Sequence, residues 1–146
     1  MGGSFISNEC KKLSTLKGFP SKVLNGVFIK DCPSPQNVNG IVNPVNGEVD
    51  LSFNKNLQSL QGMGKVLHDS LMLIDCSSLT SMEGGPTILH GNLALNGCKS
   101  IVTLQGFPKY VAFDVHVVGC KKVLNEKSIR EVCEVEGEIF QKAGEL

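Results

Sequence analysis

Cysteine is the reactive residue whose spacing is most regular in this chain of 146 residues. A column with a step of 22 begins at Cys10, and an amide replaces the thiol once, at Asn54. Side chains at such positions could form disulfides, or they could serve as buried polar groups that hydrogen-bond the neighbouring backbone. The column consists of Cys10, Cys32, Asn54, Cys76, Cys98 and Cys120, and the sixth cysteine, Cys133, lies outside it.

The register of this column favours free thiols. Stacked positions hold the side chains roughly parallel, which suits a disulfide torsion of about 90° poorly. Cys76, Cys98 and Cys120 are three successive members and cannot all pair, while Asn54 can cap the same backbone groups. We therefore expect six reduced thiols with a structural role.

Histidine offers a second possible chemistry, because His68 and His90 are separated by the same step and Asp69 is nearby. Two ligands make a poor zinc site, since zinc prefers about four, so we expect stacked surface histidines and no metal site. No phosphate loop, zinc-protease motif or nucleophile elbow is present in the sequence. The sequence predicts no catalytic residues and no cofactor, and hence a protein that is not an enzyme.

Lysines form a third column, at Lys11, Lys55, Lys99 and Lys121, with Lys12 and Lys122 beside it. A basic stripe can follow a phosphate backbone, which makes nucleic-acid binding an alternative function. The stripe is broken at Pro33 and Ser77, and 14 basic and 14 acidic side chains leave the chain with no formal net charge. A solvated turn face is the simpler interpretation, and nucleic acid is not the expected partner.

The same step governs the apolar residues, and self-similarity at that period predicts stacked coils. Each copy has a glycine, at Gly18, Gly40, Gly62, Gly84 and Gly106, which indicates positive φ or close backbone approach. Each copy also has a short alternating segment such as Leu71-Met72-Leu73, typical of a half-buried strand. Such strands pair with those of the next coil about 4.8 Å away and form a parallel sheet.

The segment from Leu71 to Leu79 resembles a leucine-rich repeat, and Leu16-Lys17-Gly18-Phe19-Pro20 resembles the return segment of the short-repeat class in bacterial effectors. The Gly-x-Pro variant is similar to small leucine-rich-repeat-like proteins of tailed phages. The resemblance covers residues 4–120 and implies a β-rich solenoid, a right-handed coil of about six 22-residue repeats with a one-sided parallel sheet. It also implies a host-directed binder that inhibits or sequesters a bacterial protein.

We expect one domain over 1–146, with a partial coil at 1–9, repeats at 10–120 and a cap at 121–146. Residues 4–7 are in strand register with residues 26–29. The cap is predicted to contain a helix over 125–133, begun by Asn125 as N-cap, and a strand at 136–140, one step after 114–118. The second copy, 32–54, is degenerate through added prolines, either by drift or as a loop shaped for a partner.

No apolar run approaches the ~20 residues that span a bilayer, and residues 1–6 lack the layout of a secretory signal. We therefore expect a cytoplasmic protein without membrane contact, in the host cytoplasm if it is phage-encoded.

The outward side of the predicted sheet is the best candidate for a functional surface. Strand residues that meet only water should be polar, yet several outward positions here are apolar. We expect a protein partner of unknown identity on this face, or self-association through it. The candidate partner-binding residues are Phe28, Asp50, Met72, Ile74, Ala94, His116 and Val118.

Overall fold

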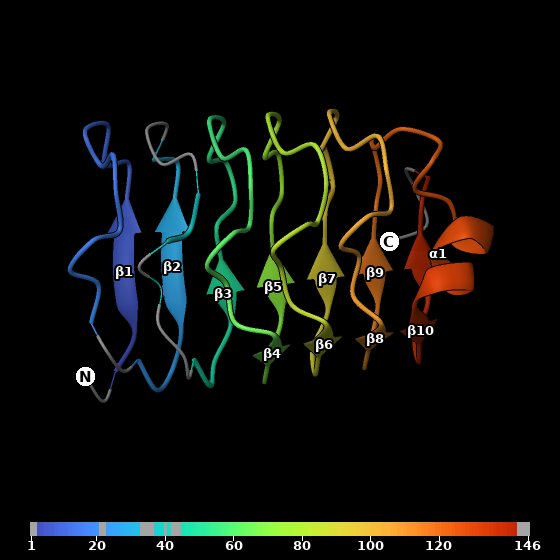
Figure 1. The fold of residues 1–146 in the computed structure, drawn as a ribbon, viewed down its shortest axis with the longest axis horizontal. Helices are drawn as coiled ribbons and strands as arrows, with labels where there is room; N and C mark the ends of the chain where they lie inside the picture. Colours follow the sequence, from blue (N-terminus) through green and yellow to red (C-terminus); the bar gives the residue numbers. More distant parts are fainter. Residues whose placement is uncertain (1–2, 21–22, 33–36, 40, 42–44, 143–146) are drawn as a thin grey trace.

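The computed structural model describes residues 3–20, 23–32, 37–39, 41 and 45–142. The chain winds into a β-solenoid of about six stacked turns of about 22 residues, as the sequence predicts (Figure 1). Much of the degenerate second copy lies outside the described residues, including Pro33, Pro35 and Gly40. The two interpretations of that copy therefore stay predictions.

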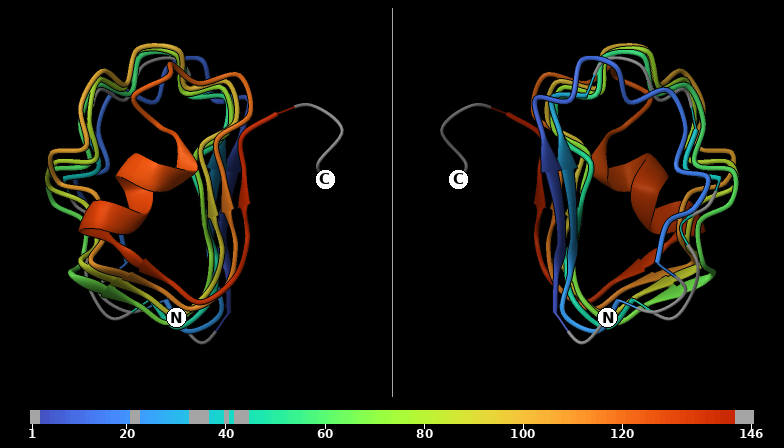
Figure 2. Two further views of the ribbon diagram at one scale, coloured as in Figure 1. Left: turned by 90° about the vertical axis from the view of Figure 1, so that its right-hand side faces the viewer. Right: turned by 90° about the vertical axis from the view of Figure 1, so that its left-hand side faces the viewer.

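One long parallel sheet forms a wall of the solenoid (Figure 2). Its seven strands follow one another in the order β1-β2-β3-β5-β7-β9-β11. They are β1 (Phe5–Asn8), β2 (Val27–Lys30), β3 (Val49–Asp50), β5 (Leu71–Met72), β7 (Leu93–Ala94), β9 (Val115–His116) and β11 (Ile139–Phe140). The predicted N-terminal strand is confirmed, because Phe5 pairs with Val27 and Ser7 with Ile29.

A second parallel sheet of four strands crosses the lower part of the coils in Figure 1, and the sequence analysis did not predict it. Its strands are β4 (Val66–Leu67), β6 (Ile88–Leu89), β8 (Tyr110–Val111) and β10 (Glu134–Val135). The apolar column at Leu67, Leu89 and Val111 is buried, and the same residues pair with one another as strand residues of this second sheet. An isolated bridge between Val23 and Val45 continues the pattern in the earlier coils.

The core fills the space between the two sheets and the return segments. Its inward strand columns are fully or almost fully buried, and burial of such side chains stabilises the fold by about 1.5–3 kcal/mol each. The columns are Val27, Val49, Leu71, Leu93 and Val115, followed by Ile29, Leu51, Leu73, Leu95 and Val117. Because each coil is too thin to bury these residues alone, stability depends on the neighbouring coils.

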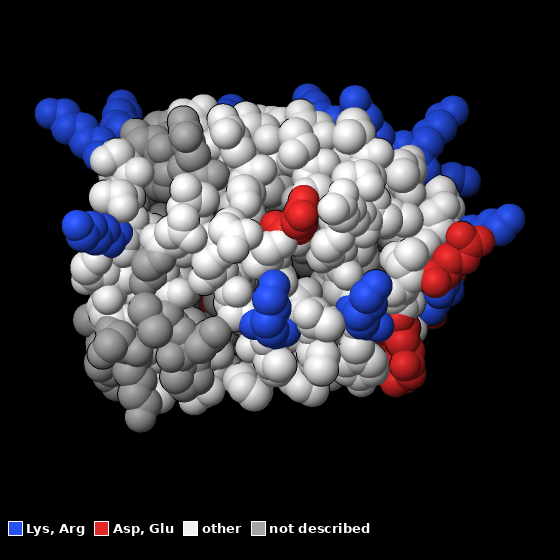
Figure 3. Space-filling view, viewed as in Figure 1, with Lys and Arg blue, Asp and Glu red and all other residues white. Residues whose placement is uncertain are grey.

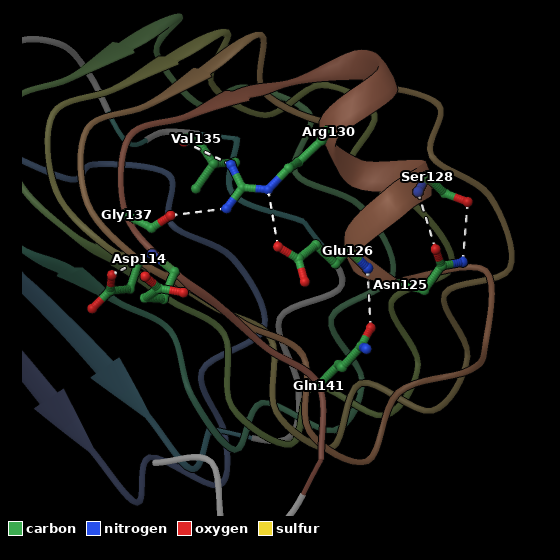
Figure 4. Close-up of polar contacts among 9 residues, drawn as sticks. Asp114, Asn125, Glu126, Ser128, Arg130, Val135, Gly137 and Gln141 are labelled. Carbon is green, nitrogen blue, oxygen red and sulfur yellow. Dashed lines mark hydrogen bonds and ion pairs between the residues drawn. The ribbon is translucent and has the colours of Figure 1, made fainter.

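The C-terminal end is closed by α1 (Glu126–Val132), which lies across the end of the coil (Figure 2). As predicted, Asn125 is the N-cap: its side-chain oxygen accepts a hydrogen bond from Ser128 N at 3.0 Å (Figure 4). The Arg130 guanidinium donates to the carbonyls of Val135 and Gly137 at 2.9 and 3.0 Å. Arg130 thereby ties the helix to the last strands.

The register of the final strand differs from the prediction. Ile139 pairs with Val115 and Phe140 with His116, so the offset is 24 and not 22. The pairing of Glu134 with Tyr110 has the same offset, so the two additional residues lie before Glu134, in the segment that forms the helix. The helical cap therefore uses two more residues than a return segment of the repeats.

The glycine column has the conformation that its position predicts. Gly18, Gly62, Gly84 and Gly106 have φ between +77° and +96°, and in each coil the residue after the glycine donates to the carbonyl two residues before that glycine. This is the geometry of a type II turn, in which the third residue needs positive φ. A methyl group on Gly84 would also lie 2.7 Å from the nitrogen and Cα of Gln61 in the preceding coil.

Gly84→Ala is expected to destabilise the fold more than Gly18→Ala. The two glycines have nearly the same φ, +85° and +87°, but a methyl group on Gly18 meets nothing within 4 Å. Both changes incur about 1 kcal/mol of left-handed strain, and only Gly84→Ala adds a backbone clash of about 1–3 kcal/mol. Urea denaturation followed by circular dichroism measures both. If both variants lose the same free energy of unfolding, contact between coils is not what restricts Gly84.

Candidate functional site

The cysteine column forms buried rungs that satisfy carbonyls of the preceding coil. The thiols of Cys76, Cys98 and Cys120 donate to the carbonyls of Leu51, Leu73 and Leu95 at 3.2, 2.9 and 2.9 Å. Asn54 does the same work, because its amide nitrogen donates to Leu51 O and Ile29 O. All six cysteines are free, and the predicted structural role is confirmed for Cys76, Cys98 and Cys120, whose thiols bond the backbone.

Burial makes five of these thiols poor nucleophiles: Cys32, Cys76, Cys98, Cys120 and Cys133. Burial raises the pKa of Cys76 to about 12 and that of Cys133 to about 11. Burial also raises the pKa of Cys32, Cys98 and Cys120, and in Cys98 the neighbouring Cys76 and Cys120 add to the effect. Because the thiolate is the reactive form, the column is suited to holding the fold together and not to covalent chemistry.

The histidines stack as expected. The rings of His68 and His90 are nearly parallel, with centroids 5.9 Å apart, and Tyr110 lies edge-on to His90 at 6.2 Å. Within the described residues, no group of three or more histidine, cysteine or acidic side chains is arranged to hold a metal ion. In the same part of the chain, no helix is long and apolar enough to cross a membrane.

The predicted partner-binding residues lie on the outward side of the seven-stranded sheet. Phe28, Met72, Ile74, His116 and Val118 are partly exposed there, whereas Asp50 and Ala94 are buried. Ala94 is short and stands between Met72 and His116 in the strand register. Asp50 is covered because its carboxylate accepts from Ser52 N at 3.0 Å and lies 3.5 Å from the Lys30 ammonium.

The strand register adds two residues to this face that the sequence analysis missed. Ile6 pairs with Phe28 and is 65% exposed, and Phe140 pairs with His116. The rings of His116 and Phe140 stack with centroids 4.8 Å apart. We call the resulting central column the outer sheet face: Ile6, Phe28, Asp50, Met72, Ala94, His116 and Phe140. The longer offset in the cap concealed Phe140, since a step of 22 from His116 ends at Glu138.

Polar side chains on both sides of this column are engaged in the sheet itself. Ser70, Asn92 and Asp114 each use a side-chain oxygen to accept the amide hydrogen of the equivalent residue in the next coil, at 2.8–2.9 Å. On the other side Ser52 and Asn96 accept from the amides of Ile74 and Val118. These ladders replace backbone bonds where the strands end, so the oxygens are already used and the side chains are held in place.

One acidic group near this face has an unfavourable electrostatic environment. Burial raises the pKa of Glu48, and the carboxylates of Asp50 and Asp69 raise it further, while Lys30 acts against them. These three carboxylates border the outer sheet face near Asp50, and Asp114 and Glu138 border it further along.

The lysine column is exposed along the turns that follow the strands. In Figure 3 most basic side chains stand along the upper margin, the margin on which Figure 1 places those turns. We call this set the basic ridge: Lys11, Lys12, Lys55, Lys99, Lys121 and Lys122. Ser77 interrupts it as predicted, and Pro33 lies outside the described residues. Glu9, Asp31 and Asp75 stand beside it and reduce its charge.

Comparison with known protein families, with curated proteins and with solved structures finds no match for this chain.

Cys76→Ser is expected to make the free energy of unfolding fall less steeply as the pH rises above 9. A buried thiol with a raised pKa stays protonated in the folded chain, whereas the unfolded chain loses that proton near the ordinary pKa of 9.0. Its stabilising effect is thus complete below pH 9 and declines as pH rises toward 12, by about 1.4 kcal/mol per pH unit for each thiol. A serine hydroxyl can keep the bond to Leu51 O and does not ionise there.

Urea unfolding of the wild type and the variant at pH 8, 9.5 and 10.5 measures this difference. The free energy of unfolding of the variant should fall less steeply, by about the contribution of one thiol. Identical slopes would mean that burial does not hold the Cys76 thiol protonated.

Proposed function

We propose that this protein is a non-enzymatic binding module that engages a protein partner through the outer sheet face. The observation that supports the proposal is a central column of mostly apolar and aromatic side chains on the sheet, between two ladders whose oxygens are occupied. Among the described residues, Figure 2 shows no element over this side of the sheet. A partly exposed apolar strip of this length favours association with another protein.

The form of the face suits a protein better than a small molecule. Three hollows of the described surface lie away from this face, at the N-terminal end, at the C-terminal end and on the basic ridge. A small ligand usually requires a concave site that buries most of its surface. The polar side chains beside the column are already fixed by hydrogen bonds and lose little conformational entropy on binding, which favours an extended protein interface.

The resemblance to phage-type leucine-rich-repeat proteins suggests which partner to seek. It would make the partner a bacterial host or defence protein that this module sequesters or inhibits. We propose that binding takes place in the cytoplasm, where free thiols such as those of the cysteine column stay reduced.

Met72→Lys combined with Ile74→Lys is expected to abolish partner binding with little loss of stability. Both side chains are partly exposed, and a lysine at 72 would stand opposite Asp50, which avoids like-charge repulsion. Ammonium groups buried at an interface without partners reduce affinity by several kcal/mol, or more than about 100-fold. Capture from bacterial lysate identifies the partner, and calorimetry with the purified partner measures the affinity.

Val66→Lys with Val102→Lys is the matched control, because it adds the same charge at apolar residues that are 40% and 57% exposed outside this face. It should bind as the wild type does. Equal binding by the two double variants would exclude the outer sheet face as the interface. Loss of binding in Lys99→Ala with Lys121→Ala alone would favour a contact through the basic ridge.

A further inference from the structure

The residue before each rung of the cysteine column has a left-handed backbone. This column consists of Glu9, Asp31, Phe53, Asp75, Gly97 and Gly119, with φ between +52° and +78°. Glycine adopts this region without strain, and aspartate tolerates it better than most residues do. Glu9 and Phe53 are neither glycine nor aspartate, and Phe53 is the aromatic member of the column, with φ of +64° and a side chain that is 40% exposed.

An exposed aromatic residue in a strained conformation requires an explanation beyond folding. In the other coils a small or acidic residue makes the same turn, and the backbone of Phe53 bonds like theirs, with its N–H donating to Ile74 O at 2.7 Å. The turn therefore has no need of a phenyl ring. Strained residues of this kind concentrate at binding sites, where the side chain contributes to function.

Phe53 borders a depression of about 320 Å³ that spans three coils. Its lining is Phe53, Lys55, Asp75, Ser77, Gly97 and Lys99. Ser77 is small, the carboxylate of Asp75 occupies the space that a Cβ on Gly97 would take, and the side chains of the two lysines are exposed. An aromatic face beside two ammonium groups is complementary to a planar base that carries phosphates.

Positive charge on both sides of the depression adds to its complementarity for phosphates. The basic ridge continues on both sides, to Lys11 and Lys12 in the first coil and to Lys121 and Lys122 in the last. Its six lysines exceed the three acidic side chains beside it, although the whole chain has no net charge. With coils about 4.8 Å apart, the lysines at 55 and 99 are about 10 Å apart along the axis, so an extended polyanion can touch several coils.

We propose that the basic ridge binds single-stranded nucleic acid, with one base stacked on Phe53 and the adjoining phosphates held by Lys55 and Lys99. Asp75 is the acidic group of the depression and weakens the attraction for phosphate. The residues that line the depression are none of those that form the outer sheet face.

The experiment is fluorescence anisotropy of the full chain with a labelled 12-nucleotide oligothymidylate, its uridylate counterpart and an abasic strand of the same length. The two base-bearing strands should bind saturably in about 50 mM salt, and the abasic strand about 5- to 150-fold more weakly, since stacking contributes about 1–3 kcal/mol per base. Affinity should decline with salt with a log–log slope of about −1.4 or steeper, as expected for two or more phosphates.

Two variants separate the base from the phosphates. Phe53→Asn keeps a residue that tolerates the left-handed turn and should reduce binding of the oligothymidylate to the abasic level. Lys55→Gln with Lys99→Gln should weaken all three strands. The matched control is Lys65→Gln with Lys109→Gln, a pair with the same separation in the sequence that lies where β4 and β8 begin, and it should change nothing.

Absence of saturable binding in low salt would overturn the proposal. So would equal affinity for the abasic strand, or wild-type affinity in Phe53→Asn, because the base would then have no role. A melting temperature of Phe53→Asn close to that of the wild type should accompany the loss of binding. If the variant unfolds, Phe53→Gly provides the same comparison in a backbone without strain.

Discussion

The solenoid depends on how the chain satisfies its backbone where it turns a corner inside the stack. After each strand the chain enters a left-handed residue and turns inward, which leaves carbonyls such as Leu51 O and Leu73 O in the buried interior. An unpaired buried carbonyl would cost about 1–3 kcal/mol. Leu51 O accepts from the side chains of Asn54 and Cys76, whereas Leu73 O accepts from the N–H of Cys76 as well as from the thiol of Cys98. The side chains thus satisfy Leu51 O and add a second bond at Leu73 O, and this shared task explains why Asn54 can replace a cysteine.

The same demand for hydrogen bonds determines what the surface can offer. Most strands of the long sheet have only two residues, and beyond their ends side-chain oxygens take the place of backbone carbonyls. Ser70 and Asn92 accept the backbone N–H of the equivalent residue in the next coil in this way. A comparable column on the return side, at Thr15, Asn37, Ser59, Ser81 and Thr103, bonds the amides two residues ahead. Much of the polar character in the sequence is therefore structural. The apolar centre of the sheet and the charged margin of the turns lie outside these ladders.

Periodicity made the fold predictable, because a fixed step assigns each residue to a column and each column to one environment. It predicted the inward strands, the rungs, the glycine turns and Asn125 as a helix cap. It did not reveal the left-handed column, since glutamate, aspartate, phenylalanine and glycine share no side-chain chemistry. Nor could it reveal the longer offset in the cap, which depends on how the helix packs. The burial of Asp50 and Ala94 was missed because it depends on the length of neighbouring side chains.

The arrangement of the sheet also determines how the molecule would respond to mechanical tension. β1 and β11 lie at opposite ends, and the bonds between coils run along the line that joins them (Figure 1). Tension between these ends acts along those bonds, so coils separate in succession instead of sliding past one another. Each released coil of about 22 residues would add about 70–80 Å of extended chain. The protein would therefore lengthen in equal steps, with the coil as the unit of extension.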